Sequence, residues 1–151
     1  MSDLPLVSII TPSFNQAQYI EATINSVLTQ DYPNIEYIIV DGGSTDGTVE
    51  IIKKYTLDLR QQTVGLQSRA ITSWVSEQDQ GQTDAINKGF ARAQGHILAW
   101  LNSDDTYEPG AISAAVKYLQ EHPEAGMVYG DCNFINETGR VIGKFGSAQT
   151  D

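Results

Sequence analysis

The chain has 151 residues, of which 40% are hydrophobic and 19% charged, a composition that fits one globular domain with a sizeable core. Nine Lys and Arg residues against 19 Asp and Glu residues give a net charge of −10. This charge argues against nucleic acid as the main partner, and an anionic ligand would need a metal ion beside it. The single cysteine, Cys132, excludes an internal disulfide and a cysteine-based zinc site.

The first half of the chain alternates β-branched runs with amphipathic segments. Residues 6–10 and 35–40 are predicted to be strands of a parallel sheet, because both runs are apolar and end at polar, Gly or Pro residues. A helix is predicted between them, since apolar residues recur there at the spacing of one helical face: Ile20, Ile24, Val27 and Leu28. Residues 49–55 repeat that spacing and predict a second helix.

The second half continues the alternation. The predicted elements are a strand at 71–76, a helix around 86–93, a strand at 97–101, a helix around 112–119, and a hairpin of 127–134 with 141–145. Residues 56–70 show no clear period and are predicted to be a loop insertion. Alternating strands and helices predict a doubly wound α/β fold with a mostly parallel sheet and a C-terminal β-hairpin. Trp100 and Phe90 are expected in its core.

Acidic residues follow several of the predicted strands. They include Asp41 after the second strand, Glu77 and Asp79 after the third, and Asp104 and Asp105 after the fourth. In an open α/β sheet, ligands bind beyond the carboxyl ends of the strands. Because like charges gathered without a cation repel each other, these carboxylates point to a metal-assisted ligand site.

The segment 40–48 reads VDGGSTDGT and begins like a dinucleotide-binding loop. The third position counted from Gly42 is Ser44, where the dinucleotide fingerprint needs a glycine, so this interpretation fails. We expect a turn in which Gly42 and Gly43 are free to take positive φ and in which Ser44, Thr45 or Asp46 can cap the next helix. Asp41 would then have a free side chain that accepts a hydrogen bond from a nucleobase N–H, unless it is an ordinary turn residue.

Two longer segments carry a family resemblance. TPSFNQAQYIEATINSVLTQDYPNIEYIIVDGGSTDGT and DQGQTDAINKGFARAQGHILAWLNSDD resemble the nucleotide-sugar-binding part of family 2 glycosyltransferases, which are inverting enzymes of the Rossmann-like A-type glycosyltransferase fold. The resemblance implies transfer of a sugar from a nucleoside diphosphate sugar, with a UDP-sugar favoured, to an acceptor hydroxyl. Residues 1–151 would form the nucleotide-sugar-binding domain, with the acceptor-binding part absent or shortened. Uridine, guanosine and thymidine donors all stay open.

The resemblance also assigns site residues. Those implied to bind the donor are Thr11, Pro12, Asn15, Asp41, Asp79, Asp84 and Asp104, and those implied to bind Mn²⁺ or Mg²⁺ are Asp105 and Asp104. Consecutive residues of an extended segment point in opposite directions, so one of the two carboxylates should bind the metal directly. We expect Asp105 to do so together with the diphosphate, while Asp104 contacts the ribose or supports the metal ligand. Asn102 stands where the family pattern commonly has an acid.

Simpler interpretations stand beside these assignments. Asp104, Asp105 and Glu108 would also suit the start of a helix, where acids complement the helix dipole. Asp46 is favoured as a helix cap, and Asp84 is expected to open its helix while staying within reach of a sugar.

The catalytic base is unknown, since in the family it usually follows the metal motif at some distance. Asp131 is the one late acid that we consider for this role. The alternative to an active enzyme is a donor-binding fragment. Such a fragment would bind the sugar nucleotide without turnover and would need a partner chain or a missing half for transfer. A sugar nucleotidyltransferase is a more distant alternative, because TPSFNQ lacks the glycines and basic residues of its phosphate loop.

Location and partners complete these expectations. The apolar run from Leu4 to Ile10 is too short for a signal sequence or a membrane span, so we expect a cytoplasmic protein, with peripheral membrane association of the full enzyme left open. The partners would be the sugar nucleotide and a saccharide or other hydroxyl acceptor, and not nucleic acid. Apolar side chains of the hairpin would favour self-association: Val128, Phe134, Val141 and Phe145.

Overall fold

The computed structural model describes residues 4–61 and 71–146, without the side chains of 57–61. Its elements are β1 (Val7–Ser13), α1 (Ile20–Leu28), β2 (Ile35–Asp41), α2 (Thr48–Gln61), β3 (Ser73–Ser76), α3 (Gln82–Phe90), β4 (Ile97–Trp100), α4 (Ala111–Glu121), β5 (Cys132–Ile135) and β6 (Val141–Phe145). The chain divides into two compact units, residues 1–113 and 114–151, and each is described by itself.

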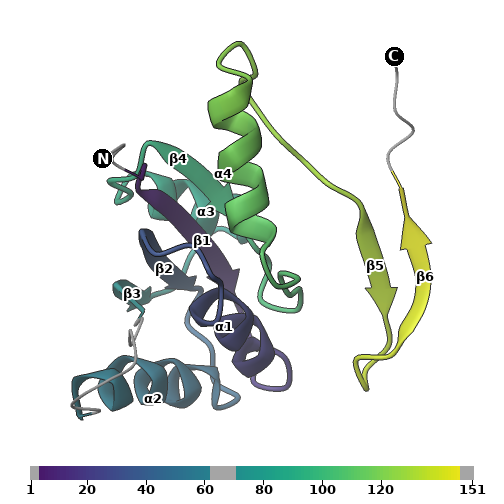
Figure 1. Cartoon of the computed structure of the whole chain (residues 1–151). Coiled ribbons are helices and arrows are strands. Elements are labelled where there is room, and N and C mark those ends of the chain that lie inside the picture. The colour runs from purple at the N-terminus through teal and green to yellow at the C-terminus, as the bar shows by residue number, and fades with distance from the viewer. Residues whose placement is uncertain (1–3, 62–70, 147–151) are drawn as a thin grey trace. The chain divides into compact units, whose positions relative to one another are not determined.

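The first unit contains a four-stranded parallel sheet in the order β3-β2-β1-β4 (Figure 1). The chain runs outward from β1 through β2 to β3 and then returns to the other side of β1 as β4. The direction of winding therefore reverses between β1 and β4, which is the topological switch point where open α/β sheets bind ligands. The predicted parallel α/β fold is confirmed.

One face of this sheet is covered by α3. Ile10, Ile38 and Val40 lie on this face and form a buried cluster with Ala85 of α3. The approach is close, because a Cβ atom on Gly89 would lie only 2.4 Å from the Ile10 side chain. A glycine at this position lets the helix pack directly on the strand.

The opposite face is also buried. Ile9, Tyr37 and Ile39 alternate with the first set along β1 and β2, and each is at most 1% exposed. The predicted apolar face of α1 is confirmed, since Ile20, Ile24 and Val27 are fully buried. Burial on both faces explains why apolar residues predominate in the centre of β1 and β2.

Two sequence predictions about the first unit are wrong. Helix α2 continues through Gln61, whereas a loop was predicted from residue 56; residues 62–70 of that predicted loop lie outside the described part. Trp100 was expected in the core but is 55% exposed. It belongs to the edge strand β4, whereas the described contacts of α3 are with β1 and β2. Phe90 packs against the buried cluster, as predicted.

The second unit contains the antiparallel pair β5 and β6. Its turn is held by Asn136, whose side-chain oxygen accepts hydrogen bonds from the backbone N–H groups of Thr138 and Arg140, and Gly139 adopts a φ of 77°. The predicted hairpin is confirmed, although its first strand begins only at Cys132 instead of residue 127. In the described ranges, no helix is long and apolar enough to cross a membrane.

Candidate ligand pocket

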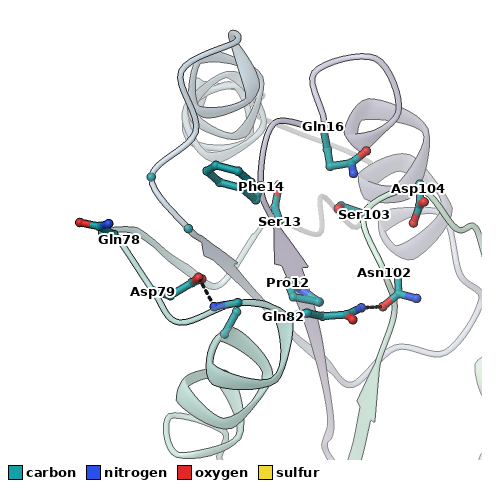
Figure 2. A pocket seen from close by; sticks show the side chains of 14 residues that line it. Pro12, Ser13, Phe14, Gln16, Gln78, Asp79, Gln82, Asn102, Ser103 and Asp104 are labelled. Carbon is teal, nitrogen blue, oxygen red and sulfur yellow. Dashed lines mark hydrogen bonds between the residues drawn. The ribbon is translucent and has the colours of Figure 1, made fainter.

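A pocket of about 780 Å³ lies at the carboxyl edge of the sheet, beside the switch point (Figure 2). Four segments line it: the end of β1 and the residues after it (Pro12 to Phe14 and Gln16), the turn after β2 (Gly42 and Gly43), the loop before α3 with the start of α3 (Gln78, Asp79, Gly81, Gln82 and Ala85), and the segment after β4 (Asn102 to Asp104). Its volume falls within the range of ordinary small-molecule sites, about 300–1,000 Å³. The sheet topology therefore brings together polar residues that are far apart in the sequence.

Two carboxylates, Asp79 and Asp104, line the pocket from different sides. Asp79 lies on the loop between β3 and α3 and is half-buried, and its Oδ1 accepts a hydrogen bond from the Gly81 N–H at 2.8 Å. Asp104 is exposed and lies on the β4 side, as Figure 2 shows. Together with Pro12, these are the predicted donor-binding residues that the structure brings to one cavity.

A chain of side-chain amides connects α3 with the segment after β4. Gln82 donates to Asn102 Oδ1 at 2.7 Å, and Asn102 in turn donates to Asp105 Oδ2 at 3.2 Å. Asp105 is exposed but does not line the pocket, whereas its neighbour Asp104 does. The two adjacent carboxylates thus have different surroundings.

Asp41 is fully buried, although its side chain was expected to be free. Its Oδ2 accepts hydrogen bonds from Gly43 N (3.1 Å), Ser44 N (2.9 Å) and Ser76 Oγ (2.6 Å), and its Oδ1 accepts one from Ser44 Oγ (2.5 Å). The expectation of a free side chain is therefore wrong. The carboxylate organises the turn after β2 and ties it to the end of β3.

Three other predicted donor-binding residues do not line the pocket. Thr11 is buried, and its hydroxyl lies 3.1 Å from the Tyr37 hydroxyl. Asn15 bridges two loops, because its side-chain oxygen accepts from Thr45 N at 3.0 Å. Asp84 accepts from Gln80 N at 3.1 Å and pairs with Lys88; the hydrogen bond from Gln80, followed by the Lys88 ammonium, lowers the Asp84 pKa.

Asp46 has the structural role predicted for it. Its carboxylate accepts hydrogen bonds from the backbone and hydroxyl of Thr48, the first residue of α2, and from Ala17 N. The hydrogen bond from the Thr48 hydroxyl, followed by that from Ala17 N, lowers the Asp46 pKa. The acid therefore stabilises the start of α2 and links it to the segment that leads into α1.

Several residues of the pocket were not predicted as ligand-binding from the sequence, among them Phe14, Gln16, Gln78 and Gln82. Phe14 is 60% exposed, so its ring is available to a ligand. Their place in the chain could have identified them, since these residues follow predicted strands or begin a helix at the ligand-binding edge. Neutral amides are common in turns, so their presence there does not by itself indicate a ligand site.

The donor set at the β4 side suits a hard divalent cation. No group of three or more His, Cys, Asp or Glu residues arranged to hold a metal occurs in the described chain. Mg²⁺ nevertheless needs only one or two carboxylates when a substrate supplies phosphate oxygens. Asp104 and Asp105 could provide these carboxylates. Asp131, the late acid considered as a base, belongs to the second unit, where it forms an ion pair with Lys144 at 3.2 Å.

A parallel sheet with an acid-lined pocket at its switch point is the arrangement in which open α/β domains bind ligands. The profile described as "Glycosyl transferase family 2" matches residues 8–144. The chain therefore belongs to glycosyltransferase family 2, as the motif resemblance implied.

Relatives and solved structures agree with this membership. The chain is 42% identical over 142 residues to TuaG of Bacillus subtilis, named for teichuronic acid biosynthesis, and covers 52% of that protein with 93% of itself. It is 33% identical to a PGL/p-HBAD biosynthesis glycosyltransferase of Mycobacterium tuberculosis, of which it covers 46% with 84% of itself. The chain thus spans about half the length of these relatives.

Among solved structures, S. aureus TarS (residues 1–349) with UDP-GlcNAc matches with a TM-score of 0.65 and 25% identity, over 78% of this chain and 32% of that one. The mannosyltransferase PcManGT of Pyrobaculum calidifontis, in complex with GDP-Man and Mn²⁺, matches with a TM-score of 0.66 and 27% identity, over 78% and 33%. Both are glycosyltransferases with the same arrangement of sheet and helices, so the A-type glycosyltransferase fold is confirmed.

Proposed function

We propose that this domain binds the nucleoside diphosphate sugar, with a UDP-sugar favoured, for an inverting transfer to an acceptor hydroxyl. The observation that carries the proposal is the pocket at the switch point, with Asp79 and Asp104 at its sides. Solved relatives hold UDP-GlcNAc and GDP-Man, which supports a sugar nucleotide as the ligand here. The activity is proposed for the whole protein, since the chain spans about half of its curated relatives.

The residues in and beside the pocket would have different roles in binding the donor. Asp105 and Asp104 would hold a Mn²⁺ or Mg²⁺ ion, which neutralises the charge of the departing diphosphate. Asn102 restrains Asp105 through its hydrogen bond, and Gln82 orients Asn102. Pro12 and Phe14 present apolar surface toward the same cavity, where a nucleobase would pack.

Calorimetry with UDP tests the metal assignment. We expect binding in the presence of Mn²⁺ and none after addition of a chelator, because the strongly acidic chain repels a bare diphosphate. Asp105→Ala should abolish binding. Glu108→Gln, which removes a nearby negative charge outside the pocket, should leave the affinity unchanged. Equal affinity with and without chelator would refute the metal assignment.

Turnover distinguishes a complete enzyme from a donor-binding fragment. Incubation of the chain with Mn²⁺, sugar nucleotides and a panel of acceptors should release little nucleoside diphosphate. A missing general base alone typically lowers the rate about 10²–10⁴-fold. Fast transfer by the 151-residue chain would instead show that one of its own acids acts as the base, and Asp131→Asn would then be the first variant to measure.

A further inference from the structure

Helix α1 has a buried polar side next to its apolar one. Thr23, Ser26 and Gln30 are spaced by three and four residues, so they lie on the same side of the helix and of the turn that ends it. Thr23 is 1% exposed, Gln30 is 4% exposed, and Ser26 is partly buried. A buried polar group is costly unless it is hydrogen-bonded, so the partners of these side chains show what this side of α1 holds.

The three side chains hold the backbone of residues 105–112, which lead from the Asp104–Asp105 pair into the start of α4. Each of them hydrogen-bonds to a backbone N–H or C=O group of this segment, and Gln30 does so through both its Nε2 and its Oε1. These hydrogen bonds are donated by Thr23 Oγ1 to Asp105 O (2.8 Å), by Tyr107 N to Ser26 Oγ (3.1 Å), by Gln30 Nε2 to Glu108 O (3.0 Å) and by Ile112 N to Gln30 Oε1 (3.2 Å). One side of α1 thus follows the segment from Asp105 to the first turn of α4.

The segment between β4 and α4 depends on these contacts, because residues 101–110 form neither helix nor strand. Backbone N–H and C=O groups outside regular structure need partners from elsewhere in the protein. The hydrogen bond from Asp105 N to Asn102 O, at 3.1 Å, closes only a local turn. The contacts with α1 instead connect the segment to residues that lie 78 to 82 positions earlier in the chain.

Asp105 is held both at its backbone and at its carboxylate. Its backbone oxygen accepts a hydrogen bond from Thr23, and its Oδ2 accepts one from Asn102. Helix α1 is itself anchored by its fully buried apolar face. Ligand-binding side chains need to be held within about 0.5 Å of the productive geometry, which an irregular segment alone does not provide. The contacts with α1 therefore fix the backbone of Asp105 relative to the sheet.

We propose that the polar side of α1, formed by Thr23, Ser26 and Gln30, positions the Asp104–Asp105 segment for binding of the divalent cation. This inference rests on the proposed function, in which the ion binds together with the diphosphate. The three side chains are positioning residues, since none of them lines the pocket and their contacts are with the backbone of the segment. Loss of one contact should let the segment adopt several conformations. Only a fraction of these presents the carboxylates correctly, and the apparent affinity for the ion falls with that fraction.

Two substitutions of Thr23 separate its hydrogen bond from its packing. Thr23→Val keeps nearly the same size and removes the hydroxyl, whereas Thr23→Ser keeps the hydroxyl and removes the methyl group. The affinity for Mn²⁺ would be measured at a fixed UDP concentration from the electron paramagnetic resonance signal of the free ion. We expect Thr23→Val to weaken Mn²⁺ binding about 10-fold, the lower end of the range for residues that support a metal ligand. Thr23→Ser should keep the wild-type affinity.

Asn25→Ala provides a matched control on the same helix. Its side-chain amide donates a hydrogen bond to the Tyr55 hydroxyl of α2 at 2.8 Å, so the variant loses a contact of α1 on a different side. We expect the affinity for Mn²⁺ to stay unchanged in this variant. A general weakening of α1 would affect Asn25→Ala and Thr23→Val alike, whereas a positioning role affects only the second.

Hydrogen exchange of the ligand-free chain provides a second readout. Ser26→Ala removes the acceptor of Tyr107 N, and exchange should become faster in residues 105–112 while the amides of β1 keep their protection. Faster exchange in β1 as well would indicate a loss of global stability and not a released segment. The same variant should also bind Mn²⁺ more weakly in the presence of UDP.

The possible outcomes separate this inference from the function on which it rests. If the wild-type chain binds no Mn²⁺ together with UDP, both are overturned. If it does bind and Thr23→Val keeps the wild-type affinity, or if Thr23→Ser and Asn25→Ala weaken it equally, the positioning role is overturned while donor binding stands. Should Thr23→Val not fold, as judged by circular dichroism, Ser26→Ala provides the same comparison with Asn25→Ala.

Discussion

Replacing Asp41 separates a structural carboxylate from a ligand-binding one. Asp41 is fully buried and accepts four hydrogen bonds, from Gly43 N, Ser44 N, Ser44 Oγ and Ser76 Oγ. Asp41→Ala removes the acceptor of all four. The two hydroxyl groups can rotate toward other acceptors, whereas the two backbone N–H groups are fixed by the turn. The main cost therefore comes from these two amides.

The magnitude follows from those two amide donors. A hydrogen bond to a charged group contributes about 1.5–3 kcal/mol, so Asp41→Ala should lower the free energy of unfolding by about 3–6 kcal/mol. Asp41→Asn keeps a carbonyl oxygen for the amides and turns its NH₂ group toward the Ser44 hydroxyl, which can accept. It loses the charge of the acceptor and reverses the hydrogen bond with Ser44, and we expect a cost of about 1–2 kcal/mol.

Urea unfolding followed by circular dichroism measures both values. The midpoint should fall in the order wild type, Asp41→Asn, Asp41→Ala, with an unchanged dependence on urea concentration. Domains have only about 5–15 kcal/mol of stability in total, so the alanine variant should be measured at low temperature. A wild-type midpoint for Asp41→Ala, combined with weaker UDP binding, would refute this reasoning and return Asp41 to the ligand site.

Three further variants test the packing, an unpaired hydroxyl and a helix cap. Gly89→Ala should lower the free energy of unfolding by about 1–3 kcal/mol, because its Cβ would lie 2.4 Å from Ile10; a gain in thermal midpoint, as in an open helix, would contradict the close packing. Ser13→Ala should leave the thermal midpoint unchanged or raise it, since the Ser13 hydroxyl is buried without a hydrogen-bond partner in the described chain; a clear fall would reveal such a partner. Asp46 has a lowered pKa in the folded chain, so its native form binds fewer protons than the unfolded form. Its stabilisation should be complete above about pH 4 and disappear as the pH falls through the lowered pKa. Thermal midpoints of wild type and Asp46→Asn should therefore converge in acid, and a constant difference from pH 2 to 7 would contradict the cap.

Much of the architecture could be predicted because it depends on patterns within short segments. The apolar spacing of Ile20, Ile24 and Val27 requires one buried helical face, and the structure buries all three. The predominantly apolar runs of β1 and β2 indicate strands covered on both sides, and both faces of these strands are buried in the structure. Local rules also identified Asp46 as a helix cap, since its partner Thr48 is two residues away.

The choice among similar carboxylates was decided only by the tertiary structure. Asp41 and Asp79 both follow predicted strands, and nothing within either segment says which oxygens remain unused. The end of β3 brings Ser76 to Asp41 and thereby satisfies it, while the loop after β3 carries Asp79 to the empty side of Gly42. Trp100 is a similar example. An apolar run predicts a strand but does not say whether the strand lies at the centre or at the edge of the sheet, and the edge position of β4 leaves Trp100 exposed. The sequence determines which groups are present and which elements form. Long-range packing decides which of those groups still have a free hydrogen-bonding atom facing the pocket, because their partners come from strands and loops distant in the chain.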